Sequence, residues 1–153
     1  MAGELEQLSY EPANDALKEQ DRSLDEVRSR TGTLLAASSV VASFLGGRAL
    51  DAVGFDWANV LALSAFAATA VLSVYVLFPR QGLARSLSGP AVYEYFIGAA
   101  VDLAEAHRQL AYWMQDAYAE NLRVVNRLFW GFRIACGALV GEVLFWSIAL
   151  GLD

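Results

Sequence analysis

The sequence predicts an all-α integral membrane protein with three transmembrane helices and a cytoplasmic helical portion. Two observations lead to this prediction. Of the 153 residues, 56% are hydrophobic and 18% are charged, whereas globular domains average roughly 45–50% and about 25%. The charges are also unevenly placed, because residues 31–47 and 57–79 contain none. About 20 apolar residues in a helix cross the roughly 30 Å of bilayer hydrocarbon, so the apolar stretches around these segments are long enough to span a membrane.

The N-terminal part of the chain is predicted to form a cytoplasmic helix and the first span. Residues 1–12 lack helical periodicity, and we predict a loose tail there. Apolar residues then recur at helical spacing, which gives a cytoplasmic N-terminal helix at 13–30. The first transmembrane helix is predicted at 31–50, because Gly46-Gly47 is expected to end the helix and a short polar turn follows.

The second transmembrane helix is predicted at 57–79, the strongest span in the sequence because it is uncharged throughout and closes at Pro79. A cytoplasmic helical segment is predicted at 81–127, where apolar residues repeat at helical spacing. No proline follows residue 90. We therefore expect this helix to run directly into the third transmembrane helix at 128–152, with Gly131 as the place for any bend.

The basic residues predict the orientation of the spans. Four lie in the N-terminal segment and five in the second connection, against Arg48 alone in the first connection and none at the C-terminus. Under the positive-inside rule, the N-terminus is therefore cytoplasmic and the C-terminus lies outside. Aromatic belts are expected to place Trp57 and Trp146 at the outer interface, and Tyr75, Phe78 and Trp130 at the inner one.

Glu142 is the most unusual residue of the third span, because a charged side chain at that depth costs roughly 3 kcal/mol or more. It cannot pair with Arg133, which lies nine positions earlier on the opposite side of the helix. Three interpretations remain for Glu142: a hydrogen bond to a serine or threonine of another span, a role in a pore or an oligomer contact, and an interfacial position in a shifted span. Arg133 is expected to extend its guanidinium group to the inner interface.

Small residues recur at helix-packing spacing in all three spans. They are Gly32, Ala36, Ser39 and Ser43 in the first, Ala58, Ala62, Ala65, Thr69 and Ser73 in the second, and the GxxxG pair Gly137 and Gly141 in the third. Small side chains let helix backbones approach closely, which matters in lipid because apolar contact alone does not drive helices together. The pattern fits a homo-oligomer interface and equally fits packing within one protomer.

Four arginines are expected to lie near the inner membrane surface: Arg28, Arg30, Arg123 and Arg127. One interpretation is a ligand-binding site for a phosphate group or for anionic lipid headgroups. The other is that these arginines only set the topology of the spans. On the middle helix, aromatic residues are expected to pack against the N-terminal helix or to stack on a ligand, and His107 to be a surface or packing residue.

The sequence lacks the signatures of several function classes. No catalytic, nucleotide-binding-loop, zinc or kinase motif occurs, so we predict no enzyme, no cofactor and no metal site. Cys136 is the single cysteine, which excludes an intrachain disulfide. No basic stripe with interleaved aromatic residues indicates binding to a nucleic acid polymer.

The entry into the first span reads Leu24-Asp25-Glu26-Val27-Arg28-Ser29-Arg30-Thr31-Gly32-Thr33-Leu34-Leu35. It resembles the same region of the Pycsar effector family, within the wider group of SLATT-type membrane effectors of bacterial nucleotide-signalled defence systems. The matching residues are Arg30, Gly32, Leu34 and Leu35. A second span, an amphipathic cytoplasmic helix and a returning apolar helix also match the family's layout, over roughly residues 14–152.

The resemblance implies an effector of a bacterial anti-phage system in the inner (plasma) membrane. Such an effector responds to a cyclic nucleotide and then disrupts the membrane, here as a homo-oligomer in the lipid bilayer. Two other functions fit the same sequence. One is a structural or scaffolding membrane protein that binds a partner through its cytoplasmic helices, and the other is a small channel subunit.

Overall fold

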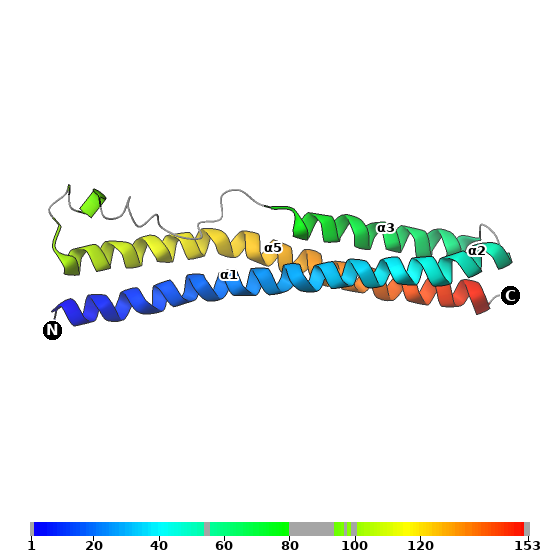
Figure 1. Cartoon of the computed structure of the whole chain (residues 1–153), viewed down its shortest axis with the longest axis horizontal. Helices are drawn as coiled ribbons and strands as arrows, with labels where there is room; N and C mark the ends of the chain where they lie inside the picture. Colours follow the sequence, from blue (N-terminus) through cyan, green and yellow to red (C-terminus); the bar gives the residue numbers. More distant parts are fainter. Residues whose placement is uncertain (1, 54–55, 80–93, 97, 99–100, 152–153) are drawn as a thin grey trace. The chain divides into compact units, whose positions relative to one another are not determined.

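The computed structural model describes residues 2–53, 56–79, 94–96, 98 and 101–151, and these residues contain helices and no strand (Figure 1). The elements are α1 (Ala2–Val41), the π-helical turn η1 (Ala42–Gly46), α2 (Gly47–Val53), α3 (Trp57–Leu77) and α5 (Leu103–Gly151). Three helical stretches are long and apolar enough to cross a membrane: Tyr10–Asp51, Trp57–Leu77 and Leu103–Gly151. The predicted all-α class with three such helices is confirmed.

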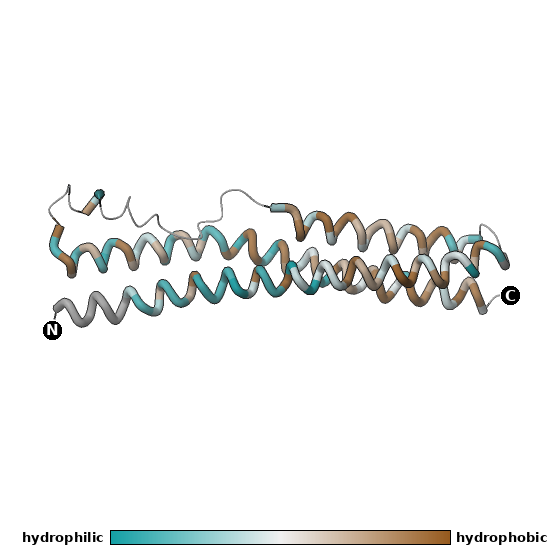
Figure 2. The backbone as a smooth tube through the Cα atoms, in the orientation of Figure 1, coloured by the Kyte–Doolittle hydropathy of each residue, from teal (hydrophilic) through white to brown (hydrophobic). Residues whose placement is uncertain are grey.

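The chain divides into two compact units, each of which contains part of α1 and part of α5. The charged unit comprises Met1–Asp25 and Arg80–Asn126, and the apolar unit comprises Glu26–Pro79 and Arg127–Asp153. Hydrophobic residues dominate α3 and the part of α5 that belongs to the apolar unit, whereas the corresponding part of α1 alternates between apolar and small polar residues (Figure 2). The apolar unit therefore contains the sequence that is suited to lipid.

The start of the chain differs from its prediction. The loose tail at 1–12 is wrong from Ala2 onward, because α1 begins there and includes Pro12. Alanine, leucine, glutamate and glutamine are good helix formers, and acidic residues are favourable near the partial positive charge of a helix N-terminus. The cytoplasmic helix predicted at 13–30 and the first part of the span predicted at 31–50 thus belong to one continuous helix.

The predicted end of the first span is also wrong, since Gly46-Gly47 does not stop the helix. Helical structure continues through η1 and α2 to Val53. The backbone at Gly47 is helical, with φ −56° and ψ −49°. A single π-helical turn inserts extra backbone into an α-helix and changes the direction of the side chains that follow, and Gly46 is the last residue of this turn.

The predicted continuity between the middle helix and the third span is confirmed, because α5 runs from Leu103 to Gly151 without a break. Gly131 is buried in this helix, and a Cβ atom at its position would lie 3.3 Å from Val76 Cγ2. Its lack of a side chain therefore lets α3 approach α5 closely. The start of the segment predicted at 81–127, up to residue 93, lies outside the described residues.

In the apolar unit, α1 runs parallel to α5. Ser38 of α1 bonds to Glu142 of α5, and further along both helices Gly46 packs against the indole ring of Trp146. The ring atoms Cζ2 and Cη2 lie 3.0 and 3.1 Å from where a Cβ atom of residue 46 would be. The π-helical turn that ends at Gly46 thus provides the space in which Trp146 is fully buried.

In the same unit, α3 runs antiparallel to the other two helices. Val76, near the end of α3, meets Gly131, whereas Ala58, near the start of α3, belongs to the same buried cluster as Ala149. The cluster comprises Ala49, Ala58, Ala62, Trp146 and Ala149. A core made largely of alanine brings the three backbones close together, which is the packing expected for helices in lipid.

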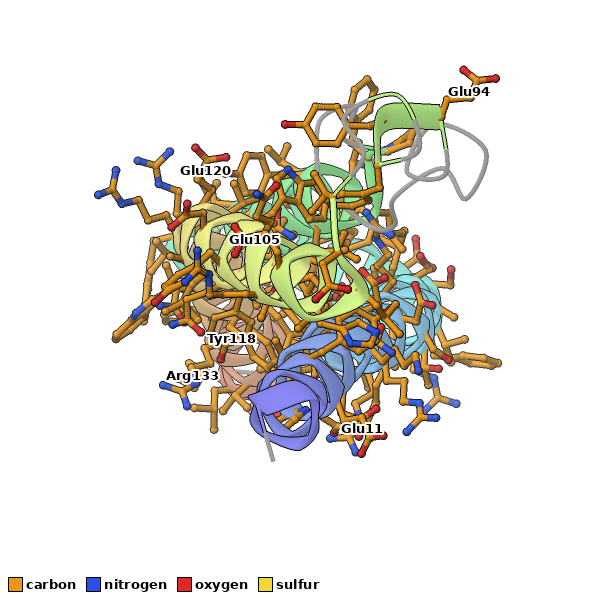
Figure 3. The ribbon with its side chains drawn as sticks, turned by 90° about the vertical axis from the view of Figure 1, so that its left-hand side faces the viewer. Glu11, Glu94, Glu105, Tyr118, Glu120 and Arg133 are labelled. Carbon is orange, nitrogen blue, oxygen red and sulfur yellow. The ribbon has the colours of Figure 1, made fainter. Side chains whose placement is uncertain are left out.

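In the charged unit, the first parts of α1 and α5 pack parallel to each other. Their buried cluster consists of Leu17, Met114 and Ala117. The rings of Tyr10 and His107 lie 5.3 Å apart and are tilted by 33°. His107 is therefore a packing residue, one of the two roles expected for it. Glu11, in the same unit, extends away from the helices (Figure 3).

Candidate functional site

The interior of the apolar unit contains polar side chains along its length. Six of them are completely buried, and we call them the polar file: Thr31, Ser38, Asn59, Thr69, Ser73 and Glu142. Large apolar side chains instead lie on the outer surface, among them Phe44, Val71, Val74, Ile134, Val140 and Leu144. This distribution places hydrocarbon-compatible groups where lipid would be, and polar groups where only the other helices surround them.

The centre of the polar file is a hydrogen bond between two helices. Ser38 Oγ of α1 lies 2.5 Å from Glu142 Oε2 of α5, where the serine hydroxyl donates to the carboxyl group. The next residue, Ser39, is exposed and instead donates to the Leu35 carbonyl of its own helix at 2.9 Å. Of the three interpretations of Glu142, the structure therefore shows the bond to a serine of another span.

The second carboxyl oxygen of Glu142 is available for a further interaction. Glu142 Oε1 is buried and has no hydrogen-bond partner among the described residues. The indole Nε1 of Trp146, one turn further along α5, is also buried and has no hydrogen-bond partner among the described residues. A buried acceptor without a donor costs about 1–3 kcal/mol, so the site holds an incompletely satisfied polar group.

The other members of the polar file lie on both sides of this central bond. The parallel pairing of Ser38 with Glu142 and the antiparallel pairing of Val76 with Gly131 set the register. From this register, Thr31 of α1 and Ser73 of α3 lie at the height of the last turns of α3. Thr69 lies between them and the bond between Ser38 and Glu142. Asn59, at the start of α3, lies toward the opposite end. The file therefore extends across most of the apolar unit.

The hydroxyl groups of the file differ in how they are satisfied. Thr31 and Thr69 donate to carbonyl groups of their own helices, at 2.7 and 3.0 Å. Such a bond satisfies the hydroxyl donor without any contact to a neighbouring helix. Ser73 Oγ, in contrast, is buried and has no hydrogen-bond partner within the described part of the chain. Ser73 and Glu142 thus both turn unsatisfied oxygen atoms to the interior.

A seven-residue repeat of buried positions explains why the polar residues of α1 and α5 face inward. Buried residues recur at this interval in α1, at Leu17, Leu24, Thr31 and Ser38, and in α5, at Met114, Asn121, Leu128, Ala135, Glu142 and Ala149. A heptad repeat keeps the same helix face toward a partner helix. The repeat is visible in the sequence and identifies Glu142 and Ser38 as members of the buried seam, although none of the predictions above used it.

The small-residue faces predicted from the sequence have different environments. Most of the face on α3 is buried within the protomer, as Ala58, Ala62, Thr69 and Ser73 show. The face on α1, formed by Gly32, Ala36, Ser39 and Ser43, is exposed. Gly137 is exposed and a Cβ atom there would meet nothing within 4 Å, whereas one at Gly141 would touch only Phe145 of the same helix. The faces on α1 and α5 thus remain open.

The four arginines of the predicted ligand site are divided between the units. Arg28, Arg30 and Arg127 belong to the apolar unit, and Arg123 belongs to the charged unit. Arg30 forms an ion pair with Glu26 of its own helix, while Arg123 and Arg127 are exposed. Within either unit alone, the four do not form one site.

Arg133 is exposed on α5 beside an indole ring, while its extension to the inner interface stays a prediction. Its guanidinium carbon lies 5.7 Å from the centre of the Trp130 ring, three residues earlier on α5. A cation over the face of an indole ring is stabilised by the ring's electron density. Figure 3 shows the Arg133 side chain extending away from the helices. In contrast, Trp146, expected in an aromatic belt, is buried in the protomer.

At the start of α5, the charged unit contains a local cluster of polar side chains. Glu105 accepts a hydrogen bond from Gln109 at 2.8 Å and pairs with Arg108 at 2.6 Å. The hydrogen bond from Gln109, followed by that from Arg108, lowers the pKa of Glu105 below its ordinary value. Further along this unit, Tyr112 and Trp113 are exposed rather than packed against the N-terminal helix.

The described residues contain no group of three or more His, Cys, Asp or Glu side chains placed to hold a metal ion. Glu142 is the one ionisable side chain among their buried residues. The chemistry that this arrangement supports is therefore exchange of a proton or of hydrogen bonds inside the span. Comparisons with protein-family models, with curated proteins and with solved structures find no match to this chain.

Proposed function

We propose that this chain is a membrane effector of a nucleotide-signalled bacterial anti-phage system, which assembles as a homo-oligomer in the inner membrane and permeabilises it when activated. The N-terminus is on the cytoplasmic side and the C-terminus outside. The observation that carries the proposal is the hydrogen bond between Ser38 and Glu142 inside the apolar unit. The resemblance at the entry to the first span supplies the biological setting.

The buried carboxyl group of Glu142 has an energetic cost that a structural role does not offset. A carboxyl side chain in the middle of a span costs roughly 3 kcal/mol or more. A well-packed apolar residue in its place is often neutral or stabilising. Stability alone therefore does not explain why a carboxyl group occupies position 142, whereas a role in function does. If α1 and α5 separate, Ser38 and Glu142 become polar groups that can line a water-filled path.

Activation requires two arrangements of the helices. The arrangement described above is closed, because Ser38 and Glu142 are bonded and completely buried. A ligand shifts the balance only if it binds the open arrangement better than the closed one. We assign this role to a cyclic nucleotide whose phosphate is held by arginines from among Arg28, Arg30, Arg123 and Arg127, since arginine binds phosphate oxygens through two parallel hydrogen bonds.

The oligomer is supported by the exposed small residues. Gly137 and the α1 face that contains Gly32 and Ala36 do not pack against the described parts of the protomer. In lipid, such faces let the backbone of a second copy approach closely. Several copies also supply the several polar side chains that a water-filled path needs, because each protomer contributes a single intramembrane carboxyl group among its described residues.

The proposal is tested in bacterial cells that express the full chain from an inducible promoter, together with a nucleotide cyclase. A membrane-potential dye reports depolarisation. We expect stronger depolarisation with a cyclic nucleotide than without one. Ser38→Ala loses the bond that holds the closed arrangement, so it should respond to a lower concentration of cyclic nucleotide. Ser64→Ala is the matched control, because its exposed hydroxyl donates to the Val60 carbonyl of its own helix. Absence of depolarisation both with and without cyclic nucleotides refutes the proposal.

One observation favours a second function, that of a scaffold. Tyr112 and Trp113 of the charged unit are 70% and 39% exposed, and exposed aromatic residues are enriched where proteins bind each other. In this case the charged unit binds a partner protein and the apolar unit is an anchor. The scaffold predicts growth without arrest and co-purification of one stable partner, which Tyr112→Ala weakens.

A further inference from the structure

We propose that the polar file of the apolar unit conducts protons, and that Glu142 takes up and releases each proton. This inference goes beyond the proposed function, because it assigns proton transfer to a single protomer in the closed arrangement and requires no activating ligand.

The members of the file are spaced at intervals of about one helical turn along the unit. Ser73 and Thr69 are four residues apart on α3, and a rise of 1.5 Å per residue separates them by about 6 Å. Measured along the helix axes, Thr69 lies a similar distance from the bond between Ser38 and Glu142. Trp146 follows Glu142 by one turn of α5, and Asn59 lies at about the same height along the axes as Trp146. Single water molecules bonded to these groups bridge gaps of about one turn, since buried waters usually bond to polar side chains.

Glu142 Oε1 and Ser73 Oγ have no hydrogen-bond partner in the described part of the chain, and both residues are completely buried. Each is an acceptor that a bridging water can satisfy. In the closed protomer they are the positions where a proton carrier can bind, because the remaining hydroxyl groups of Thr31 and Thr69 are already directed to backbone carbonyls.

The packing at one end of the file favours protons over larger ions. There, alanine side chains and the ring of Trp146 form a buried cluster, and the ring packs closely against Gly46. A hydrated sodium or potassium ion does not fit such a core, whereas a proton moves along hydrogen bonds and needs no space of its own. Conduction through the closed protomer is therefore expected for protons and not for larger ions.

The transfer step is a protonation and a deprotonation of one carboxyl group. The Glu142 carboxylate accepts a proton on Oε1 from a hydronium ion on one side, and the neutral acid then gives a proton to a water molecule on the other side. Ser38 keeps donating to Oε2 throughout and positions the group. The net result is one proton moved across the unit, with no change in the protein.

No other ionisable group competes with Glu142 inside the file. The described residues of α3 carry no charged side chain, and Tyr75 near its end is exposed. On α5, Arg133 is exposed and Cys136 is partly buried. On α1 and α2, Arg28, Arg30 and Arg48 lie toward the two ends of the unit, away from the level of Ser38. Glu142 is thus the single carrier.

The experiment uses the purified full chain in vesicles of phosphatidylethanolamine and phosphatidylglycerol. A pH-sensitive dye inside reports proton entry, which a potassium gradient with valinomycin drives. Calcein in parallel vesicles reports leakage of larger solutes. We expect proton entry above that of empty vesicles, without calcein release. Glu142→Gln keeps the size and the acceptor for Ser38 but cannot carry a proton, so entry falls to the level of empty vesicles.

Two further comparisons keep the test decisive. Glu142→Asp retains an ionisable group and is expected to conduct, with a shifted dependence of the rate on pH. Ser38→Ala is expected to slow proton entry because it removes a positioning hydrogen bond, whereas Ser64→Ala, whose hydroxyl donates to its own helix, leaves the rate unchanged. If Glu142→Gln fails to fold, equal rates and pH profiles for the wild type, Glu142→Asp and Ser38→Ala overturn the proposal.

Other outcomes separate this inference from the proposed function. Proton entry no faster than in empty vesicles, or undiminished in Glu142→Gln, overturns the proton path while leaving activated permeabilisation intact. Release of calcein along with protons also overturns it, because the path is then a general hole. Selective proton entry combined with no depolarisation of cells on adding cyclic nucleotide supports the path and refutes the effector function.

Discussion

Gly46 and Gly47 offer a comparison in which neighbouring substitutions have opposite effects. Both residues are helical and adjacent, but their surroundings differ. A Cβ atom at residue 46 would lie 3.0 Å from Trp146 Cζ2 and 3.1 Å from Cη2, whereas one at residue 47 would meet nothing within 4 Å. Trp146 is completely buried, so its ring cannot move away to solvent. The added methyl group is thus tolerated at one position only.

Two opposing effects set the expected changes in the free energy of unfolding. Replacing glycine by alanine inside a helix stabilises it by about 1 kcal/mol. Overpacking a filled core costs about 1–3 kcal/mol. We therefore expect Gly47→Ala to stabilise the protein by about 1 kcal/mol, and Gly46→Ala to change the stability by between zero and about 2 kcal/mol of destabilisation. The difference between the variants, about 1–3 kcal/mol, isolates the contact with Trp146.

The assay is unfolding of the full chain in mixed micelles as the fraction of sodium dodecyl sulfate rises, followed by tryptophan fluorescence. The free energy of unfolding of each variant is compared with that of the wild type. Stabilisation of both variants by the same amount would refute the reasoning, because it would mean that the Trp146 ring does not contact residue 46. A Trp146→Phe background should reduce the difference between them, since the smaller ring leaves room for a methyl group.

Three more predictions follow from named contacts. Ser38→Ala is expected to destabilise the protein by about 1–2 kcal/mol, because Glu142 loses its donor, and Ser39→Ala by close to zero; the same unfolding assay checks both. Gly137→Leu should leave the protomer folded and shift the oligomer toward monomer in crosslinking, and an unchanged oligomer would exclude this face as the interface. The pKa of Glu105 is lowered in the folded chain, so the stability it contributes is present above the pKa of the unfolded chain and is lost as the pH falls through the lowered value. A carboxyl-carbon NMR titration should show the pKa of Glu105 rising in Gln109→Ala, and no change would contradict the assigned cause.

The parts of the fold that depend on local composition were predicted from the sequence. The helical class and the second span follow from the absence of charge and from apolar length, which act along a single helix. The continuity of α5 follows in the same way, because nothing in its sequence breaks a helix. The heptad of buried residues that includes Leu128, Ala135 and Glu142 was equally readable, and it places Glu142 on the inner face.

Features that depend on contact between distant segments were beyond sequence reasoning. Glycine normally suggests a helix end, yet Gly46 continues the helix because Trp146, a hundred positions later, occupies the space of its missing side chain. The heptad places Ser38 rather than Ser39 on the buried seam, but only the packed helices show that the partner of Ser38 is Glu142. A repeat indicates which face of a helix is buried, whereas the neighbouring helices determine what that face contacts. Only packing of the three helices therefore distinguishes the buried small-residue face of α3 from the exposed one of α1.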